Sequence, residues 1–475
     1  MKNRGNLIES LAKEMGSADL GDQRRSKRLA EMVGKIAQGP DRSFPDIFTD
    51  PAQLSAAYRF FSNPEVGHEA ILTSHVLGTV TRAKERGTVL VVHDTTELSF
   101  GGESRRQGMG RLRTSGQGFY AHVGLVLDAD GSREPLGLAG IRTVFRQEKK
   151  GHRTAAQRRQ DPENESRRWS SLALESDGLL RGQAAAIHLM DREGDSYPLL
   201  SELTKASLRF VVRLCHDRML EGENGERGGM LQQEVSSTPF IAEREVPLSL
   251  RGRRGRTAQQ QRIHPPRQMR LARLRFSALS VKLRRPNNYP KESLPDSLSI
   301  NVVRVKEVDA PAGVAPIEWL LATTEPVETP QDILRVVDWY RARWVIEEFN
   351  KALKTGCAFE ARQLETQHAL LNALALLAPI ACLLLRIRSL ARTAPTQPAA
   401  PLFPPLELTV LRAMAPVPLS DEPTVQEVLA AIARLGGHLK RNGPPGWLVL
   451  FRGYKKLQAF AQGWAAAMAT AQQKM

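Results

Sequence analysis

Two continuous apolar runs place the strongest constraint on the fold. Thr88–His93 and Ala184–Met190 lack the polar alternation of a strand that has one face in water. Runs of this kind are typical of central strands that are covered on both faces. A helical pattern, Trp169–Leu180, precedes the second run, and another, Ser196–Lys205, follows it. We therefore expect an α/β fold in which helices cover a sheet.

The order of the neighbouring elements narrows the fold further. Phe119–Leu127 and Pro135–Phe145 have strand patterns, with a turn at Asp128–Gly131, and can form a meander with the first run. Arg209–Leu214 provides a fifth strand. Meander, helix, strand, helix and strand is the order of a ribonuclease H-like mixed sheet. Many α/β folds share such an order, so this match alone is weak.

Changes in sequence pattern divide the rest of the chain into segments. Residues 1–75 are predicted to be a helical N-terminal unit, with a second helix that begins after Gly21–Asp22. The core is predicted over 76–390, with a β-rich insertion at about 215–325. Within the core, the polar stretch 146–168 is predicted to be a mobile loop. A proline-rich linker then leads into a helical C-terminal region, 391–475, which closes with an alanine-rich helix.

The charge of the chain points to a polyanionic partner. Lys and Arg number 67 against 51 Asp and Glu, which gives a net charge of +16. The longest apolar stretch, Ala369–Leu385, is interrupted by Asn372 and Pro379 and falls short of the roughly 20 residues of a membrane span. We predict a buried core helix there, so the expected polyanion is nucleic acid and not lipid. Three scattered cysteines and an N-terminus without a signal-peptide pattern indicate a reducing cytoplasm.

Two segments concentrate positive charge. Arg24, Arg25, Lys27 and Arg28 occupy four of five positions at the start of the predicted second helix. A solvated face and a phosphate-binding face are both open for such a cluster. Arg251–Arg285 carries 12 cations and no acid, which predicts that a polyanion neutralises it.

Two aspartates follow the two apolar runs. Asp94 comes after Thr88–His93, and Asp191 comes after Ala184–Met190. If these strands are neighbours about 4.8 Å apart, the carboxylates converge at one rim of the sheet. Paired carboxylates repel unless a cation neutralises them, and their hard oxygens favour Mg²⁺ or Mn²⁺. Either aspartate alone is more often the cap of a turn.

A third element carries a carboxylate among cations. Residues 339–354 lack Pro and Gly and predict one helix. At about 100° per residue, one arc of roughly 80° holds an aromatic ring, three cations and an acid: Tyr340, Arg343, Glu347, Lys351 and Lys354. A solvated face with Glu–Lys pairs is the alternative. The flanking Trp344, Ile346 and Phe349 favour a helix that is packed on both sides and forms the wall of a site.

These residues reproduce a known signature. Tyr340, Arg343, Glu347 and Lys354 match the Tyr-x₂-Arg-x₃-Glu-x₆-Lys pattern, and the chain resembles the Tn-five-type (IS-four family) bacterial DDE transposases. The blocks LGDQRRSKRLAEM, AAYRFFSNPEVGHEAIL, HDTTELSF, MDREGDSY, EWLLATTEPV and RWVIEEFNKALKTG resemble that family in the same order. The resemblance thins at 215–310 and after about residue 390.

The resemblance implies a cut-and-paste transposase with a ribonuclease H-like core, an N-terminal DNA-binding domain and a C-terminal dimerisation region. Asp94, Asp191 and Glu347 take the catalytic and metal-ligand positions, with two Mg²⁺ ions as the working hypothesis and Mn²⁺ as a substitute. Further positions are implied to contact DNA: Tyr340, Arg343, Lys351, Lys354, Arg213 and Trp319, the last by stacking on a flipped base. His93, before Asp94, departs from the family pattern.

The implied partners are double-stranded transposon ends and target DNA, with a homodimer in the paired-end complex and no membrane. Three other classes remain open: a non-catalytic inhibitor from the same family, a nuclease or resolvase of the same fold, and a glycosidase that uses paired carboxylates. The glycosidase is disfavoured because it needs neither the cationic helix face nor the +16 charge.

Overall fold

A computed structural model describes the chain in two compact units. The described residues are 7–101, 105–112, 116–146, 164–222, 224–248, 265–289, 294–415, 418–439 and 445–473. Unit 1 contains Met1–Arg168, Glu175–Ala185 and Trp344–Met475, and unit 2 contains Trp169–Leu174 and Ala186–Arg343. Each unit is described by itself. The predicted boundaries at residues 75 and 390 stay a prediction.

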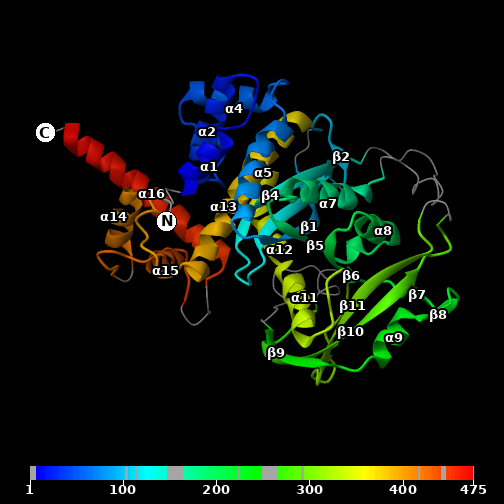
Figure 1. Ribbon diagram of the computed structural model, residues 1–475. Helices are drawn as coiled ribbons and strands as arrows, with labels where there is room; N and C mark the ends of the chain where they lie inside the picture. Colours follow the sequence, from blue (N-terminus) through cyan, green and yellow to red (C-terminus); the bar gives the residue numbers. More distant parts are fainter. Residues whose placement is uncertain are drawn as a thin grey trace. The chain divides into compact units, whose positions relative to one another are not determined.

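Unit 1 begins with five helices (Figure 1). They are α1 (Leu7–Met15), α2 (Gln23–Gln38), α3 (Phe44–Ile47), α4 (Pro51–Ser62) and α5 (His68–Lys84). Asp22 caps α2 because its side chain accepts the Arg24 N–H at 2.8 Å. The helical N-terminal segment and the start of its second helix are therefore as the sequence predicts.

The strands of unit 1 form the predicted meander. The long strands are β1 (Thr88–Phe100), β3 (Gln117–Asp128) and β4 (Pro135–Val144), and β2 (Gly110–Arg111) adds a short edge. β3 pairs antiparallel with β1 on one side and with β4 on the other. β1 is longer than predicted, because β3 pairs with it at every residue from Val89 to Phe100.

Helix α5 is fastened to β4 and to α1 by a buried polar network. Gly137 of β4 permits the close approach, since a side chain there would collide with α5. His75 Nε2 accepts the Leu138 N–H at 3.2 Å, and its Nδ1 lies 2.6 Å from Glu14 of α1. Burial pushes the pKa of Glu14 upward, but His75 and Arg82 outweigh it and lower that pKa to about 2. The N-terminal helices thus join the strands through charged groups.

The C-terminal half of unit 1 is helical. A short helix, α12 (Val345–Lys351), is followed by two single turns and then by α13 (Gln367–Thr393), α14 (Pro405–Met414), α15 (Val425–Leu435) and α16 (Trp447–Gln473). Gln367–Leu390 is long and apolar enough to cross a membrane, but 83% of its most apolar window is buried inside the structure. This confirms the predicted core helix at Ala369–Leu385.

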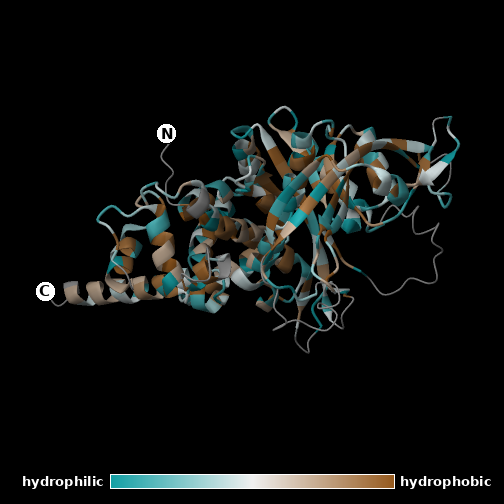
Figure 2. Cartoon of the chain, turned by 90° about the horizontal axis from the view of Figure 1, so that it is seen from below, coloured by the Kyte–Doolittle hydropathy of each residue, from teal (hydrophilic) through white to brown (hydrophobic). Residues whose placement is uncertain are grey.

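Unit 2 is built on a mixed sheet. Its strands are β5 (Ala185–Met190, the first residue of which belongs to unit 1), β6 (Arg209–Leu214), β7 (Met219–Glu221), β8 (Arg227–Met230), β9 (Ala242–Leu248), β10 (Arg270–Arg284), β11 (Ser297–Val308) and β12 (Glu318–Thr323). The order is β5-β6-β12-β11-β10-β7-β8, with β9 also on β10. β5 and β6 are parallel, and the other described pairs with a printed register are antiparallel. Figure 2 shows hydrophilic and hydrophobic residues mixed along these strands.

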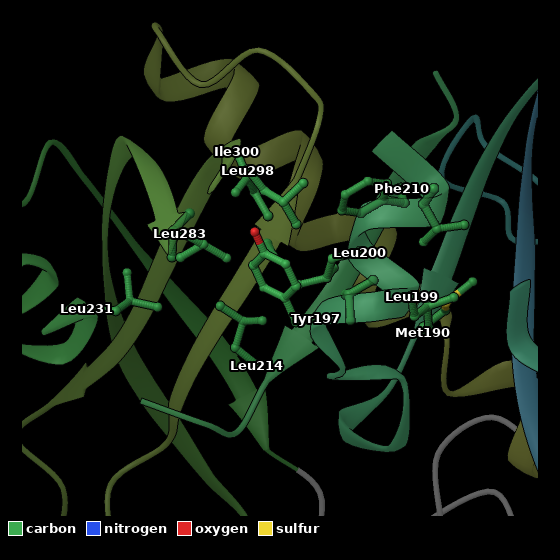
Figure 3. Packing of buried hydrophobic residues seen from close by; sticks show 14 of the residues in the cluster. Met190, Tyr197, Leu199, Leu200, Phe210, Leu214, Leu231, Leu283, Leu298 and Ile300 are labelled. Atoms are coloured by element: carbon green, nitrogen blue, oxygen red, sulfur yellow. The ribbon is translucent and has the colours of Figure 1, made fainter. Parts of the chain in front are cut away.

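Helices α8 (Tyr197–Lys205), α9 (Leu231–Ser237) and α11 (Pro330–Ala342) complete unit 2, while α7 (Arg167–Leu180) is divided between the units. Tyr197 lies at the centre of the unit 2 core with leucines such as Leu200 and Leu214 around its ring (Figure 3). Its hydroxyl donates to the Pro295 carbonyl at 2.9 Å, so the buried polar atom is satisfied.

The chain is therefore a mixed α/β protein with a mixed sheet and helices at both ends, as predicted. Described strands also occupy the predicted β-rich segment, 215–325. Its status as an insertion in a ribonuclease H-like core stays a prediction. Most of the predicted mobile loop, residues 147–163, lies outside the described residues.

Candidate active site and nucleic-acid interface

Asp94 lies inside a strand and not at its end. The sequence places it directly after the first apolar strand, but β1 continues for six residues beyond it, to Phe100. The extension exists because Asp94 pairs with Val123 of β3 and the pairing does not stop there. The Asp94 side chain is half-buried, and its Oδ2 accepts the Asn350 Nδ2–H of α12 at 2.9 Å.

Asn350 is a residue that sequence reasoning missed. It lies three positions after Glu347 on α12, and residues at that spacing share one face of a helix. This spacing was the available signal: an amide beside a predicted carboxylate ligand. The hydrogen bond connects the helix that carries Glu347 to the strand that carries Asp94, within unit 1.

The predicted continuous helix over 339–354 is wrong in detail. α11 ends at Ala342, two residues in a turn follow, and α12 begins at Val345. Arg343 and Trp344 keep right-handed helical angles, but the regular hydrogen bonding is interrupted. The next segment, Ala352–Gly356, is a wider π-turn, which changes the rotation per residue. One uniform 100° step therefore does not relate Tyr340 to Lys354.

The predicted packing of this segment is also only partly right. Ile346 and Phe349 are fully buried, as expected for the side of a helix that faces a core. Trp344 is 56% exposed and does not provide the predicted second flank. The segment is thus held from one side, and Glu347 lies half-buried on it.

The π-turn and the residues after it run along the distal part of β1. Lys354 Nζ donates to the Glu97 carbonyl, and Glu360 Oε1 accepts the Ser99 N–H at 2.9 Å. Lys354 also lies 3.9 Å from the Glu360 carboxylate. These bonds satisfy backbone groups that β3 does not reach. Lys354 is predicted to contact DNA, and in this structure its ammonium group contacts the strand of Asp94.

Asp191 follows β5 directly, as predicted, and belongs to unit 2. Its Oδ1 accepts the Glu193 N–H at 2.8 Å and caps the short 3-10 helix Arg192–Gly194. The first residue of β5 belongs to unit 1, where the Ala185 N–H donates to the Gly87 carbonyl at 2.7 Å, one residue before β1. The two strands thus begin side by side. The convergence of Asp94, Asp191 and Glu347 on one metal site stays a prediction.

Unit 2 brings together three residues that are predicted to contact DNA. The Trp319 and Tyr340 rings meet edge to face, with centroids 5.5 Å apart, and the Arg213 guanidinium lies 5.8 Å from the Trp319 centroid. Trp319 is half-buried and Tyr340 is buried. Burial raises the pKa of Tyr340 and lowers the pKa of Arg213. The cluster is a prearranged aromatic and cationic surface from β6, β12 and α11.

His93 belongs to the core. It is fully buried, and side chains alternate along a strand, so it faces away from Asp94. Its ring stacks on His122 with centroids 5.7 Å apart. Burial, with Arg168 nearby, lowers the pKa of His122 to about 3, so that imidazole is neutral. The His122 Nδ1 lies 2.9 Å from the Thr95 hydroxyl.

The four cations at the start of α2 differ in their surroundings. Arg25 is ion-paired with Glu65 and donates to the Leu20 carbonyl at 3.0 Å, and Arg28 lies 3.2 Å from Glu31. Arg24 and Lys27 are exposed, and neither side chain has an acidic partner among the described residues. Lys351 on α12 is exposed as well, whereas Arg343 is half-buried.

The prediction of unopposed charge in Arg251–Arg285 is wrong for four arginines in the described part of that segment. Arg270, Arg273 and Arg275 on β10 and Arg285 beyond it pair with acids that lie outside the segment: Glu307, Glu243, Asp309 and Asp296. The absence of acids inside the segment did not reveal these partners. Residues 249–264, with the remaining arginine-rich stretch, lie outside the described residues.

A second group of metal-binding residue types occurs in unit 2. Asp195, Cys215 and His216 have ligand atoms within 4.8 Å of one another. The Asp195 carboxylate is already used, because it accepts the N–H groups of Cys215 and His216 at 2.6 and 2.8 Å and pairs with Arg218. This group therefore fixes the loop after β6.

Two segments of the chain match models of known protein families. Residues 142–385, slightly more than half of the chain, match the family model described as transposase DDE domain. The chain belongs to this family. Residues 9–66 match a second family model, described as transposase DNA-binding. The DDE match contains Asp191 and Glu347, and Asp94 precedes it.

A comparison with solved structures finds a weak likeness. A piggyBac transposase, solved as a synaptic complex with hairpin DNA, matches at 11% identity with a TM-score of 0.31. The match covers 64% of this chain and spans about half, 48%, of that one. Membership of the family, and not this likeness, identifies the chain as a transposase-type enzyme with a DNA-binding domain. DDE domains use divalent metal ions.

Proposed function

We propose that this chain binds transposon ends and cuts DNA with a divalent-metal site held by Asp94, Asp191 and Glu347. One observation carries the proposal: in a chain of the DDE family, Asn350 connects the strand of Asp94 to the helix of Glu347 at 2.9 Å. Within unit 1, the Ala185 N–H donates to the Gly87 carbonyl at 2.7 Å, so the segment that leads to Asp191 begins beside the segment that leads to Asp94.

The donor set fits a hard cation. Three carboxylates supply oxygen ligands of the kind that Mg²⁺ prefers, and Mn²⁺ accepts the same ligands. Asp94, Asp191 and Glu347 would hold the ion, which would supply activation of a water or a 3′-hydroxyl and stabilisation of the leaving oxygen in phosphoryl transfer. The protein residues orient the reactants: Asn350 holds the Asp94 carboxylate, and Lys354 and Glu360 hold the strand of Asp94 in place.

The finer proposal follows the resemblance to Tn-five-type bacterial transposases. In it, a ribonuclease H-like core with a β-rich insertion nicks each end, forms a hairpin, reopens it and joins the end to target DNA. Tyr340, Arg343, Lys351 and Lys354 bind phosphates near the cleaved bond, and a homodimer holds the paired ends in the bacterial cytoplasm. The aromatic surface of Arg213, Trp319 and Tyr340 supports a place for a flipped base.

The first test replaces Asp94. We expect Asp94→Ala to abolish Mg²⁺-dependent nicking of a supercoiled plasmid that carries the flanking terminal repeats. Binding to those ends in a mobility-shift assay should remain, because the N-terminal region supplies the contacts. Normal nicking by Asp94→Ala would end the metal assignment. Hairpin-ended products from the wild type would distinguish a transposase from a nuclease and from a non-catalytic inhibitor.

A second test addresses the hairpin step. Stacking of a base on an aromatic ring is worth about 1–3 kcal/mol, so Trp319→Ala should slow hairpin formation roughly 5- to 150-fold while first-strand nicking is retained. Trp319→Phe keeps a ring and should restore most of the rate. Gel analysis of time courses with end-labelled duplex separates nicked from hairpin products. Equal slowing of both steps by Trp319→Ala would contradict a stacking role.

A further inference from the structure

One oxygen beside Asp94 lacks a partner. The Asn350 side chain donates through Nδ2 to Asp94, while its Oδ1 is buried and accepts no hydrogen bond from the described residues. Buried polar atoms are nearly always paired, so an unpaired amide oxygen at a predicted metal site calls for an explanation. An amide oxygen is a hard electron-pair donor, and it can accept a hydrogen bond from a water molecule that is bound to a metal ion.

The orientation of this amide follows from its partner. A carboxylate only accepts hydrogen bonds, so the amide nitrogen must face the Asp94 Oδ2, and the amide oxygen must face away from it. The side chain therefore presents one donor to a metal ligand and one acceptor to the space beside it. Asn350 is also close to Glu347 along one helix face.

We propose that Asn350 is a positioning residue of the metal site: its Nδ2 holds the Asp94 carboxylate, and its Oδ1 would accept a hydrogen bond from a water molecule on the metal ion. The inference rests on the proposed function and deepens it, since it adds a fourth polar side chain to the three carboxylates. Groups that orient metal ligands typically contribute 10- to 100-fold to metal affinity or activity.

A second asparagine in unit 1 provides a matched comparison. Asn372 of α13 is fully buried, donates through Nδ2 to the carbonyls of Phe61 and Val66 at 2.9 Å each, and also has an unpaired Oδ1. Its partners are the carbonyl of Phe61 in α4, the carbonyl of Val66 between α4 and α5, and the His368 ring, and not a carboxylate. Asn372 therefore ties helices together, and its replacement reports on stability alone.

The test measures metal binding directly. Mn²⁺ is titrated into the full-length, DNA-free protein and followed by calorimetry, for the wild type, Asn350→Ala, Asn350→Asp, Asn372→Ala and Asp94→Ala, with thermal melts of each. We expect the Kd for Mn²⁺ to rise about tenfold in Asn350→Ala and to stay unchanged in Asn372→Ala. Asn350→Asp keeps the shape of the side chain but sets a carboxylate against Asp94.

That last variant gives a readout that a structural role would not produce. Two carboxylates at 2.9 Å repel, so without metal Asn350→Asp should melt at a lower temperature than the wild type. Addition of Mn²⁺ should raise the melting temperature of Asn350→Asp by more than it raises that of the wild type. Wild-type Mn²⁺ affinity in both Asn350 variants would overturn the inference, as would equal weakening in Asn372→Ala. If Asp94→Ala binds Mn²⁺ like the wild type, the metal assignment itself fails. If only Asp94→Ala loses Mn²⁺, the metal assignment stands and the role of Asn350 falls.

Discussion

Helix α2 and strand β10 are both rich in arginine, yet their charges have different surroundings. On β10, Arg270, Arg273 and Arg275 each pair with an acid that lies more than 30 residues away in sequence. At the start of α2, two of four cations are paired, and Arg24 and Lys27 extend into solvent without an acidic partner among the described residues.

The difference comes from the neighbours of each element. β10 lies between β11 and β9, and these strands bring Glu307 and Glu243 to its arginines. The first turns of α2 are mostly exposed, and among the described residues the acids that form ion pairs with their cations are Glu65 and Glu31. A long basic run therefore does not identify a DNA surface, because sheet pairing can neutralise it. A short exposed cluster is the better candidate.

The largest expected effect is on β10, where removal of one cation leaves a buried anion. The Glu307 side chain is fully buried and pairs with Arg270, which holds the pKa of Glu307 below its ordinary value. Arg270→Ala should lower the free energy of unfolding by about 3–5 kcal/mol, because an uncompensated buried charge remains. Urea denaturation followed by circular dichroism measures this loss.

A neighbour on the same strand is the control. Arg273 and its partners Glu243 and Asp309 are 40% exposed or more, so Arg273→Ala should cost less than about 1 kcal/mol. The cost of Arg270→Ala should also shrink at acid pH, since protonation then discharges Glu307. Similar costs for the two variants at neutral pH would show that burial does not distinguish these ion pairs.

The elements of the core could be predicted from local pattern. The apolar runs, the meander, the fifth strand at Arg209–Leu214 and the core helix at Ala369–Leu385 all appear where hydrophobic periodicity places them. The end of β1 could not be predicted, because Thr95–Phe100 is a strand only through its pairing with β3. Likewise, the break in the helix at Arg343 and Trp344 could not be predicted, because the sequence there contains no Pro or Gly.

The carboxylates of the candidate site could be predicted from the sequence, but the contacts that support them could not. Asp191 follows its strand as predicted, and Glu347 lies on a helix. Asn350, Lys354 and Glu360 act on β1 from more than 250 residues away, through bonds that no local pattern encodes. The aromatic contact between Trp319 and Tyr340 is likewise a product of the fold.

The smaller expected effect is on α2, and it concerns DNA binding and not stability. Each phosphate contact contributes about 0.9 to the slope of log affinity against log salt. If Arg24 and Lys27 each bind a phosphate, the double variant Arg24→Ala/Lys27→Ala should reduce the slope by about 2 for end-containing duplex. Its melting temperature should remain that of the wild type, because neither side chain has an ion-pair partner among the described residues.

The paired cations of the same helix sharpen this test. Arg25→Ala/Arg28→Ala removes the same number of charges from the same turns, but Arg25 also holds Glu65 and the Leu20 carbonyl. We expect that variant to melt at a lower temperature and to change the salt slope less, since part of its charge is already neutralised by acids. A larger slope change in Arg25→Ala/Arg28→Ala than in the Arg24 and Lys27 variant would mean that DNA displaces Glu65 and Glu31. Exposure in the free protein would then be a poor guide to the cations that bind phosphate.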